Sequence, residues 1–243
     1  MSKKVTPYNT SEQSKKEQVE HMFDTISGEY DSLNRVISFG IDVKWRKKVV
    51  QIVADTQPQS ILDIATGTGD LIINMAKKTA ATKLIGLDIS EGMLSMGRKK
   101  IKQVGLDNRI EMVQADSENM PFDDDSFDAI TVAFGVRNFE HLEKGLDEIL
   151  RVLKPGGVFV ILETSVPTKT PFKQGYNIHC NYILPAVGRL FSKDKDAYAY
   201  LSKSASVFPF GEALNNIIRK IGFTKVENQP QTFGVATIYT ASK

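Results

Sequence analysis

Short apolar runs alternate with segments of helical spacing through the middle of the chain. The runs occupy residues 60–65, 83–88, 110–115, 127–134 and 157–163, and the helical segments among them occupy residues 70–78, 90–104 and 140–153. Apolar runs of this length that end near Gly or Asp are typical of buried strands. Because parallel strands need long crossover connections, the alternation predicts a Rossmann-like α/β core, a mostly parallel sheet with helices on both faces.

The segments before this core predict an N-terminal helical cap. Apolar side chains recur on one helix face in residues 15–27, and a second helix is expected over 41–54. The stretch between them, 28–40, combines aromatic and turn-forming residues. Residues 1–14 are polar, so we expect a flexible tail that leads into a cap at 15–56.

After the core the alternation stops, and residues 167–210 mix aromatic, polar and basic side chains. We interpret this stretch as a helical insertion suited to substrate selection. A helix over 211–221 and strands over 224–228 and 235–241 then complete a seven-stranded sheet. Together these segments predict a single domain, with a cofactor-binding core at residues 57–166.

Composition narrows the class of protein. The 243 residues include 41% hydrophobic and 25% charged residues, as in ordinary globular proteins. The formal charge of +2 gives no overall argument for nucleic-acid binding. The single cysteine, Cys180, suits a reducing compartment, and the polar start lacks the apolar segment of a secretion signal, so we expect a cytoplasmic protein.

The first expected strand runs into a glycine-rich turn, Gly67-Thr68-Gly69, with a helix directly after it. Glycines let a ligand approach the backbone, and the helix N-terminus offers free N–H groups. Asp88 ends the second strand 19 residues after Gly69, where a carboxylate can accept both hydroxyls of a ribose. The ligand is therefore expected to carry a nucleoside.

A dinucleotide is the competing ligand, but the third glycine of its motif would fall at Ile72 and is absent. Asp63 precedes the turn and Asp70 follows it, and both would repel a pyrophosphate. S-adenosylmethionine, a nucleoside with a sulfonium and an ammonium group, fits better. Asp116 and Ser117 end the third strand, where they are placed to meet the adenine. The alternative is that these acids only cap helices and turns.

These motifs resemble those of class I S-adenosylmethionine methyltransferases, and within them the family that C-methylates menaquinone and ubiquinone precursors. The segments that carry the resemblance are 23–34, 38–40, Trp45-Arg46, 62–70, Phe134-Gly135-Val136-Arg137-Asn138, 151–157, 163–167, 185–188, 198–201 and 208–209. The resemblance implies that Thr68, Asp88 and the pair Asp116-Ser117 bind the cofactor. Ser117 is a mild departure, because relatives often have a small apolar residue there.

C-methylation of a quinol needs an ionised hydroxyl next to the reacting carbon, and no metal. At the end of the fourth strand Arg137 is placed to stabilise the phenolate, Asn138 to fix the second oxygen, and Tyr30 to close over the ring. The alternative is that Arg137 and Asn138 only pin their loop. The general base is unidentified. His179 is one candidate, and Cys180 is expected to be a structural thiol.

The insertion also carries aromatic and apolar side chains that could line an isoprenoid tunnel or simply pack in the core. They are Phe172, Tyr176, Tyr182, Leu184, Phe191 and Tyr198.

The expected reaction is methylation of demethylmenaquinol to menaquinol. A polyprenyl benzoquinol of the ubiquinone pathway is the alternative substrate, and a non-catalytic S-adenosylmethionine-binding protein is a further alternative. A prenylated quinol is apolar, so we also expect peripheral contact with the membrane surface. The basic cluster Lys44, Arg46, Lys47 and Lys48 beside Trp45 is the expected docking helix, unless Trp45 belongs to the core and this is a solvated helix face. The sequence indicates no oligomeric state.

Overall fold

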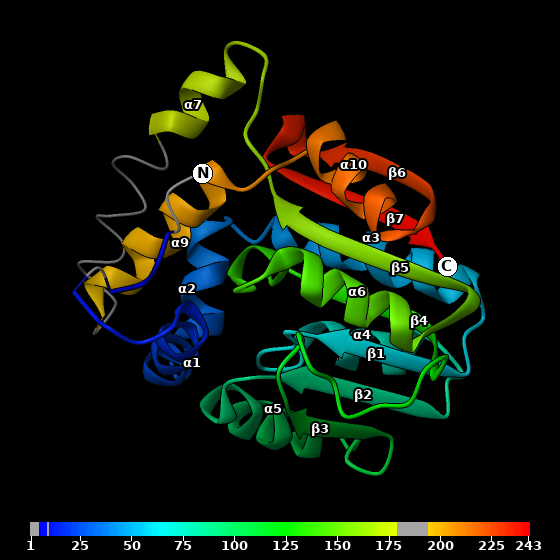
Figure 1. Cartoon of the computed structure of the whole chain (residues 1–243). Helices are drawn as coiled ribbons and strands as arrows, with labels where there is room; N and C mark the ends of the chain where they lie inside the picture. The colour runs from blue at the N-terminus through cyan, green and yellow to red at the C-terminus, as the bar shows by residue number, and fades with distance from the viewer. Residues whose placement is uncertain (1–4, 9, 179–193) are drawn as a thin grey trace.

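A computed structural model describes residues 5–8, 10–178 and 194–243 and contains a seven-stranded sheet of order β3-β2-β1-β4-β5-β7-β6 (Figure 1). The strands are β1 Ser60–Ile64, β2 Lys83–Asp88, β3 Ile110–Gln114, β4 Phe127–Ala133, β5 Leu153–Thr164, β6 Thr224–Gln231 and β7 Ala236–Ser242. The first five are mutually parallel, and β7 runs antiparallel to both β5 and β6. The predicted Rossmann-like sheet is confirmed.

Helices cover both faces of the sheet because successive side chains of a strand point to opposite sides. Along β1, Leu62 and Ile64 belong to one apolar cluster and Ile61 to another. The first cluster is completed by α6 Leu142–Val152 and α10 Glu212–Ile221, and the second by α3 Asp42–Asp55, α4 Asp70–Lys78 and α5 Glu91–Gln103. In Figure 1, α6 and α10 lie in front of the sheet and α3 behind it.

The segment Lys154-Pro155-Gly156-Gly157, which follows α6, lies inside β5. Leu153 pairs with Phe127, but the next pairing joins Val158 to Ala129, so the residues between them form a bulge in one long strand. Gly156, at φ 78°, takes the left-handed conformation that this bulge requires.

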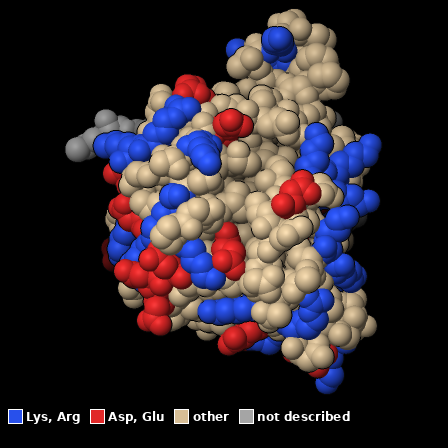
Figure 2. Space-filling model, turned by 90° about the vertical axis from the view of Figure 1, so that its right-hand side faces the viewer, with Lys and Arg blue, Asp and Glu red and all other residues tan. Residues whose placement is uncertain are grey.

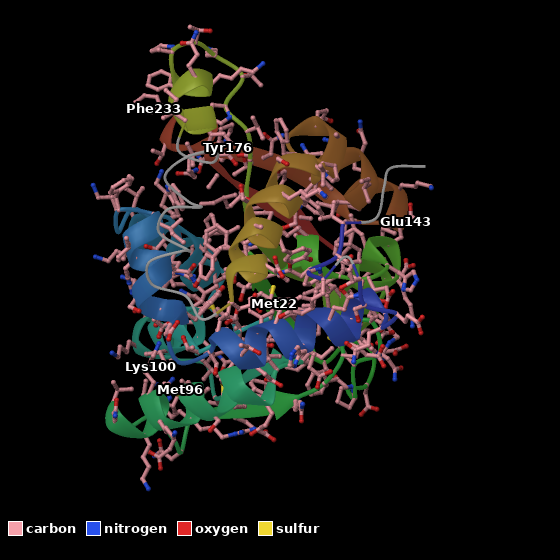
Figure 3. All side chains as sticks on the ribbon, turned by 90° about the vertical axis from the view of Figure 1, so that its left-hand side faces the viewer. Met22, Met96, Lys100, Glu143, Tyr176 and Phe233 are labelled. Atoms are coloured by element: carbon pink, nitrogen blue, oxygen red, sulfur yellow. The ribbon has the colours of Figure 1, made fainter. Side chains whose placement is uncertain are left out.

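The cap consists of α1 Lys15–Ile26, α2 Tyr30–Ile37 and the start of α3. Helix α2 lies within residues 28–40, for which no helix was predicted from the sequence. A third cluster of buried residues joins the cap to α5 and to α9 Lys195–Val207. Its members are Val19, Met22, Ile26, Met93, Ala197, Tyr198 and Tyr200. The insertion therefore returns to the cap, as the position of Met22 in Figure 3 shows.

Part of the polar segment before α1 contacts the folded body. The hydroxyl of Tyr8 donates to Asp194 at 2.5 Å, and its backbone N–H donates to the side chain of Gln18 at 2.9 Å. Ser14 and Glu17 then form a capping box that begins α1. We expected a flexible tail up to residue 14, but these contacts attach Tyr8 and Ser14 to the folded body.

The topology gathers the carboxyl ends of β1 to β4 at one edge of the sheet, beneath the cap. The short helix α7 Phe172–Ile178 projects beyond the same end of the molecule (Figure 1). Among the described residues, no helix is long and apolar enough to cross a bilayer.

Candidate active site

The glycine-rich turn after β1 is held by two buried carboxylates. Asp63 accepts hydrogen bonds from the hydroxyls of Thr66 and Thr131, each at 2.6 Å. Asp88, at the end of β2, accepts from the backbone N–H of Gly67 at 2.8 Å and from that of Ser90 at 3.0 Å. The positive φ of Gly67, 59°, lets its N–H turn toward Asp88. Both acids therefore shape the turn.

Burial gives Asp88 an unusual acidity. The side chain is 7% exposed, and desolvation raises its pKa to about 6, against the opposing effect of its backbone donors. Two carboxylate oxygens offer about four acceptor positions, so the backbone donors of Gly67, Ser90 and Ile89 leave room for a ligand hydroxyl. Asp88 is thus an available acceptor that ionises only slightly below neutral pH.

A first pocket lies between the carboxyl ends of β1 to β4 and the cap. Of the predicted site residues, Tyr30, Gly67, Asp88, Asp116, Ser117 and Asn138 line it. The cap contributes Lys16, Val19 and Phe23, and Met93 of α5 adds an apolar wall. Lys16 forms an ion pair with Asp116 at 3.2 Å, which joins the cap to the end of β3.

Thr68 and Gly69 are not among the residues that line this pocket. The hydroxyl of Thr68 donates to Asp31 at 2.7 Å and accepts from Lys100 at 2.9 Å, while Gly69 caps α4. Figure 3 shows Lys100 on α5, close to the cap. The geometry gives no support to a cofactor contact by the Thr68 side chain. Its observed partners instead fasten α2 to the glycine-rich turn.

The acids that face the first pocket also differ from those expected. Asp63 bonds to two threonines, and Asp70 pairs with Lys100 at 2.8 Å and with Arg35 at 3.3 Å, so neither lines the pocket. The carboxylates in the described lining are Asp88, Asp116, Glu118 and Glu140, against the one cation Lys16. The pocket therefore has the expected excess of carboxylates, which favours a cationic ligand, but partly different residues supply them.

A second pocket lies beside the first. Its described lining is Tyr30, Asn34, Ile37, Ser38, Asp42, Trp45, Arg46, Phe134, Arg137, Thr164, Tyr176, Leu201, Ser202, Ala205 and Val235. Tyr30 and Phe134 line both pockets, so these two rings form the wall between them. Six of the other lining residues are apolar or aromatic, four are polar and uncharged, and three are charged, namely two guanidinium groups and one carboxylate.

Arg137 is almost completely buried next to Glu163, the partner that the sequence did not single out. Its Nη1 donates to Glu163 Oε1 and to the carbonyl of Phe134, both at 2.6 Å. Burial disfavours the guanidinium charge, but Glu163 outweighs this effect and holds the pKa of Arg137 above its ordinary value. The Nε of Arg137 and the Oε2 of Glu163 are buried without a hydrogen-bond partner. This cation therefore keeps an unused donor beside the second pocket.

Asn138 and Tyr30 are the other two residues that the sequence predicts to be catalytic. Asn138 accepts from the Tyr200 hydroxyl at 3.1 Å, and its Nδ2 lies 3.4 Å from the carbonyl of Phe134. Burial raises the pKa of the Tyr30 phenol, while Arg46 and Arg137 oppose the shift. The bonds of Asn138 and Arg137 to Phe134 also agree with the loop-pinning alternative, so their roles stay predictions.

The predicted tunnel residues separate in space. Tyr176 lines the second pocket, whereas Tyr198 is buried in the cap cluster and Phe172 stacks on Phe233 with ring centroids 3.8 Å apart. Figure 3 places Tyr176 and Phe233 near each other at the end that carries α7. The remaining candidates, His179, Cys180, Tyr182, Leu184 and Phe191, lie outside the described residues.

Comparison with known proteins decides the family. The model of the ubiE/COQ5 methyltransferase family matches residues 11–243. The chain belongs to the ubiE/COQ5 methyltransferase family. A relative from Bacteroides fragilis, named demethylmenaquinone methyltransferase, is 47% identical over 240 residues, 99% of this chain and 98% of that protein. Another relative, from Geobacter sulfurreducens, is named ubiquinone/menaquinone biosynthesis C-methyltransferase UbiE. It is 43% identical, and the match covers 99% of this chain and 93% of that protein.

Solved structures agree with the fold of a ubiE/COQ5 methyltransferase. A SAM-dependent methyltransferase from Thermotoga maritima, described as a possible histamine N-methyltransferase, has a TM-score of 0.61 at 19% identity. The match covers 92% of this chain and 99% of that one. At such low identity the likeness shows the class I methyltransferase fold alone. The family resemblance expected from the sequence is confirmed.

Sequence reasoning assigned Tyr30 of the cap to this ubiE/COQ5 site, but it missed Asp42 and Arg46 of α3 and Glu163 of β5. Asp42, Arg46 and Glu163 all lie within or next to the segments that carried the resemblance, which was the available signal. Asp42 and Arg46 pair with each other four residues apart, as exposed charges on many helices do, so their spacing did not mark them as site residues. Glu163 was missed because its partner, Arg137, lies 26 residues away in the chain.

Proposed function

We propose that this protein transfers a methyl group from S-adenosylmethionine to a ring carbon of demethylmenaquinol, which gives menaquinol and S-adenosylhomocysteine. The observation that carries the proposal is the pair of pockets that meet at Tyr30 and Phe134. One is acidic and lies at the glycine-rich turn, and the other is largely apolar with a buried guanidinium.

The first pocket fits S-adenosylmethionine by the chemistry of its residues. Asp88 would hold the ribose hydroxyls, and Asp116 with Ser117 would meet the adenine, which lies against apolar side chains such as Met93. The excess of carboxylates favours the ammonium and sulfonium groups. When bound, the cofactor supplies an electrophilic methyl group on its sulfur.

The second pocket fits a quinol ring with an apolar tail. Trp45, Leu201 and Val235 provide apolar surface, and Arg137 offers positive charge to a developing phenolate. Tyr30 and Phe134 would confine the ring against the cofactor pocket and exclude water. Alignment of two bound reactants is itself a large part of catalysis in displacement reactions.

The names of several relatives favour demethylmenaquinol, while the second pocket suits either prenylated quinol. The alternatives are a polyprenyl benzoquinol as substrate and cofactor binding without catalysis. Each quinol would be offered in reduced form with labelled S-adenosylmethionine. We expect label in menaquinol. Preferred labelling of the benzoquinol would favour the ubiquinone pathway, and tight cofactor binding with no transfer to either quinol would favour the non-catalytic alternative.

Cofactor affinity should depend on the ionisation of Asp88. Ribose hydroxyls donate to the carboxylate, so the cofactor binds preferentially to the charged form of Asp88. Below its pKa of about 6, Asp88 is protonated and must lose this proton before the cofactor binds. We expect the dissociation constant to rise about tenfold from pH 7 to pH 5. Isothermal titration calorimetry over this range measures it.

Asp88→Asn should weaken binding by about 1.5–3 kcal/mol and remove this pH dependence. Asp107→Asn is the control, because Asp107 is an exposed acid that neither lines the pocket nor bonds to the glycine-rich turn. Unchanged affinity in Asp88→Asn would exclude Asp88 from the cofactor site.

Membrane contact is the second part of the proposal, with a docking surface that differs from the one expected. Trp45 is buried and donates to Thr232 at 2.8 Å, and Arg46 is paired with Asp42, so neither is free for lipid. Large apolar side chains are instead exposed around the second pocket. They are Val36, Phe39, Phe172, Ile178 and Phe233, with Phe39 72% and Phe233 68% exposed.

Lysines lie near this apolar rim. Lys44 and Lys47 are exposed on α3, and Lys169 and Lys173 are exposed beside α7. Figure 2 shows Lys and Arg side chains along one edge of the molecule and on the lobe that projects above it. Each cation near an anionic lipid surface contributes about 1 kcal/mol, so rim and lysines together suit an anionic bilayer.

Lys44→Glu/Lys47→Glu should therefore reduce sedimentation with phosphatidylglycerol vesicles, and binding by the wild type should fall as salt rises. Lys77→Glu/Lys78→Glu is the matched control, since these exposed lysines end α4 at the opposite edge of the sheet. Equal vesicle binding by both variants would show that α3 does not dock.

A further inference from the structure

The second pocket contains a carboxylate that no step described so far uses. Asp42, the first residue of α3, is 5% exposed and lines this pocket together with Tyr30 and Arg137. Within the described lining it is the one carboxylate, and no histidine is present there. The site therefore holds one acidic side chain in the place where a quinol would lose a proton.

The neighbours of Asp42 fix its position without saturating it. Ser38 donates to Oδ1 at 2.8 Å, Arg46 approaches Oδ2 at 3.5 Å, and Arg35 lies 3.8 Å from Oδ1. Only the serine contact is a short hydrogen bond. A carboxylate accepts about four hydrogen bonds, so Asp42, which lines the pocket, retains capacity for a further donor.

A chain of contacts relates Asp42 to the wall between the pockets. Its partner Arg46 lies over the ring of Phe134, with the guanidinium carbon 5.4 Å from the ring centroid. Phe134 is one of the two rings shared by both pockets. The carboxylate is thus tied to the side of the substrate pocket that borders the cofactor pocket.

The other ionisable groups of this pocket suit a proton acceptor less well. Burial raises the pKa of Tyr30, which keeps its phenol protonated at neutral pH. Arg46 and Arg137 are cations with no acceptor capacity. Glu163 is engaged with Arg137 and is not among the residues that line the pocket.

We propose that Asp42 is the general base that removes the hydroxyl proton of the quinol in the second pocket. The inference rests on the proposed function. The O–H bond breaks and its proton passes to the Asp42 carboxylate, while the electron pair on oxygen flows into the ring. The ring carbon then bonds to the methyl carbon as the bond from methyl to sulfur breaks, and that electron pair stays on sulfur. The carbon loses its hydrogen as a proton to water, and Asp42 returns its proton to the oxygen.

Arg137 and Asp42 would then have separate roles in the ionisation of the quinol hydroxyl. The guanidinium stabilises negative charge on the oxygen, and the carboxylate receives the proton. General base catalysis by a positioned side chain contributes about 10²–10⁴-fold. Asp42→Asn keeps the shape of the side chain and removes its ability to accept a proton as a base, so the maximal rate should fall by that amount.

A more acidic substrate separates this role from a structural one. A demethylmenaquinol analogue with electron-withdrawing fluorine on the ring ionises with less help from a base. The deficit of Asp42→Asn should therefore shrink at least about tenfold with this analogue if the base contributes as expected. Asp42→Glu should recover part of the rate with the natural quinol, because it restores a carboxylate.

Asp55→Asn is the matched control, an exposed acid at the other end of α3. Calorimetry with S-adenosylmethionine and thermal melting would be run on every variant. Cofactor affinity should stay near wild type for Asp42→Asn, whereas loss of the charge that faces Arg35 and Arg46 should lower its melting temperature. A rate within a few-fold of wild type, or an equal deficit with both quinols, would overturn the proposal. Failure of the wild type to methylate either quinol would instead contradict the proposed function.

Discussion

Replacement of Arg137 by Ala is expected to lower the maximal rate of methyl transfer by about 10²–10³-fold, as loss of an oxyanion donor does. The guanidinium lines the substrate pocket and not the cofactor pocket, so the dissociation constant of S-adenosylmethionine should change little. Stopped assays at saturating quinol, with calorimetry for the cofactor, measure the two quantities separately.

The same change should also destabilise the fold. Glu163 is 1% exposed and would lose its cationic partner, which typically costs about 3–5 kcal/mol. The double variant Arg137→Ala/Glu163→Ala removes both charges and should recover part of the melting temperature without recovering the rate. Recovery of the rate in the double variant would assign Arg137 a purely structural role and support the loop-pinning alternative.

Gly135→Ala should be the most damaging small substitution near the cofactor pocket. A Cβ at this position would lie 2.5 Å from the Cβ of Ala65 and 2.9 Å from Val132 Cγ1. Ala65 cannot rotate away, because its Cβ is fixed to the backbone of the glycine-rich turn. We expect a loss of about 1–3 kcal/mol in the free energy of unfolding, together with weaker cofactor binding. Chemical denaturation and calorimetry report the two effects.

A second substitution makes this steric argument specific. In Ala65→Gly/Gly135→Ala the closest collision is removed, so the double variant should be more stable than Gly135→Ala alone. Gly28→Ala is the control, because a Cβ there meets nothing within 4 Å. Additive effects of the two substitutions would mean that the contact between Gly135 and Ala65 does not limit the packing of the turn.

The parallel core was predictable because its signals are local. Strands such as β1 are buried along their whole length and so appear as continuous apolar runs. Helix α2 was not predictable in this way. Its apolar residues Tyr30, Leu33 and Ile37 have helical spacing, but the helix is only eight residues long, so the contacts of Tyr30 and Ile37 with the cap cluster are needed to stabilise it.

The candidate site also contains residues that local sequence signals predict and residues that they do not. Gly67 and Asp88 come from consecutive strands of one sheet, and their separation in sequence predicts their meeting at its edge. Thr68 was assigned to the cofactor although its hydroxyl faces Asp31, a residue of the cap. The sequence contains no signal for how the cap packs on the sheet, so the residues that depend on this packing, Asp42 among them, could not be placed.

The attachment of α1 across the cofactor pocket bears on how fast the protein turns over. Lys15 donates to the carbonyls of Arg137 and Phe139, and Asp24 accepts from Ser90 and from the N–H of Gly92. These contacts fasten both ends of a helix that forms one wall of the cofactor pocket. We expect exchange of the cofactor to require movement of α1, so the lifetime of bound S-adenosylhomocysteine should depend on these hydrogen bonds.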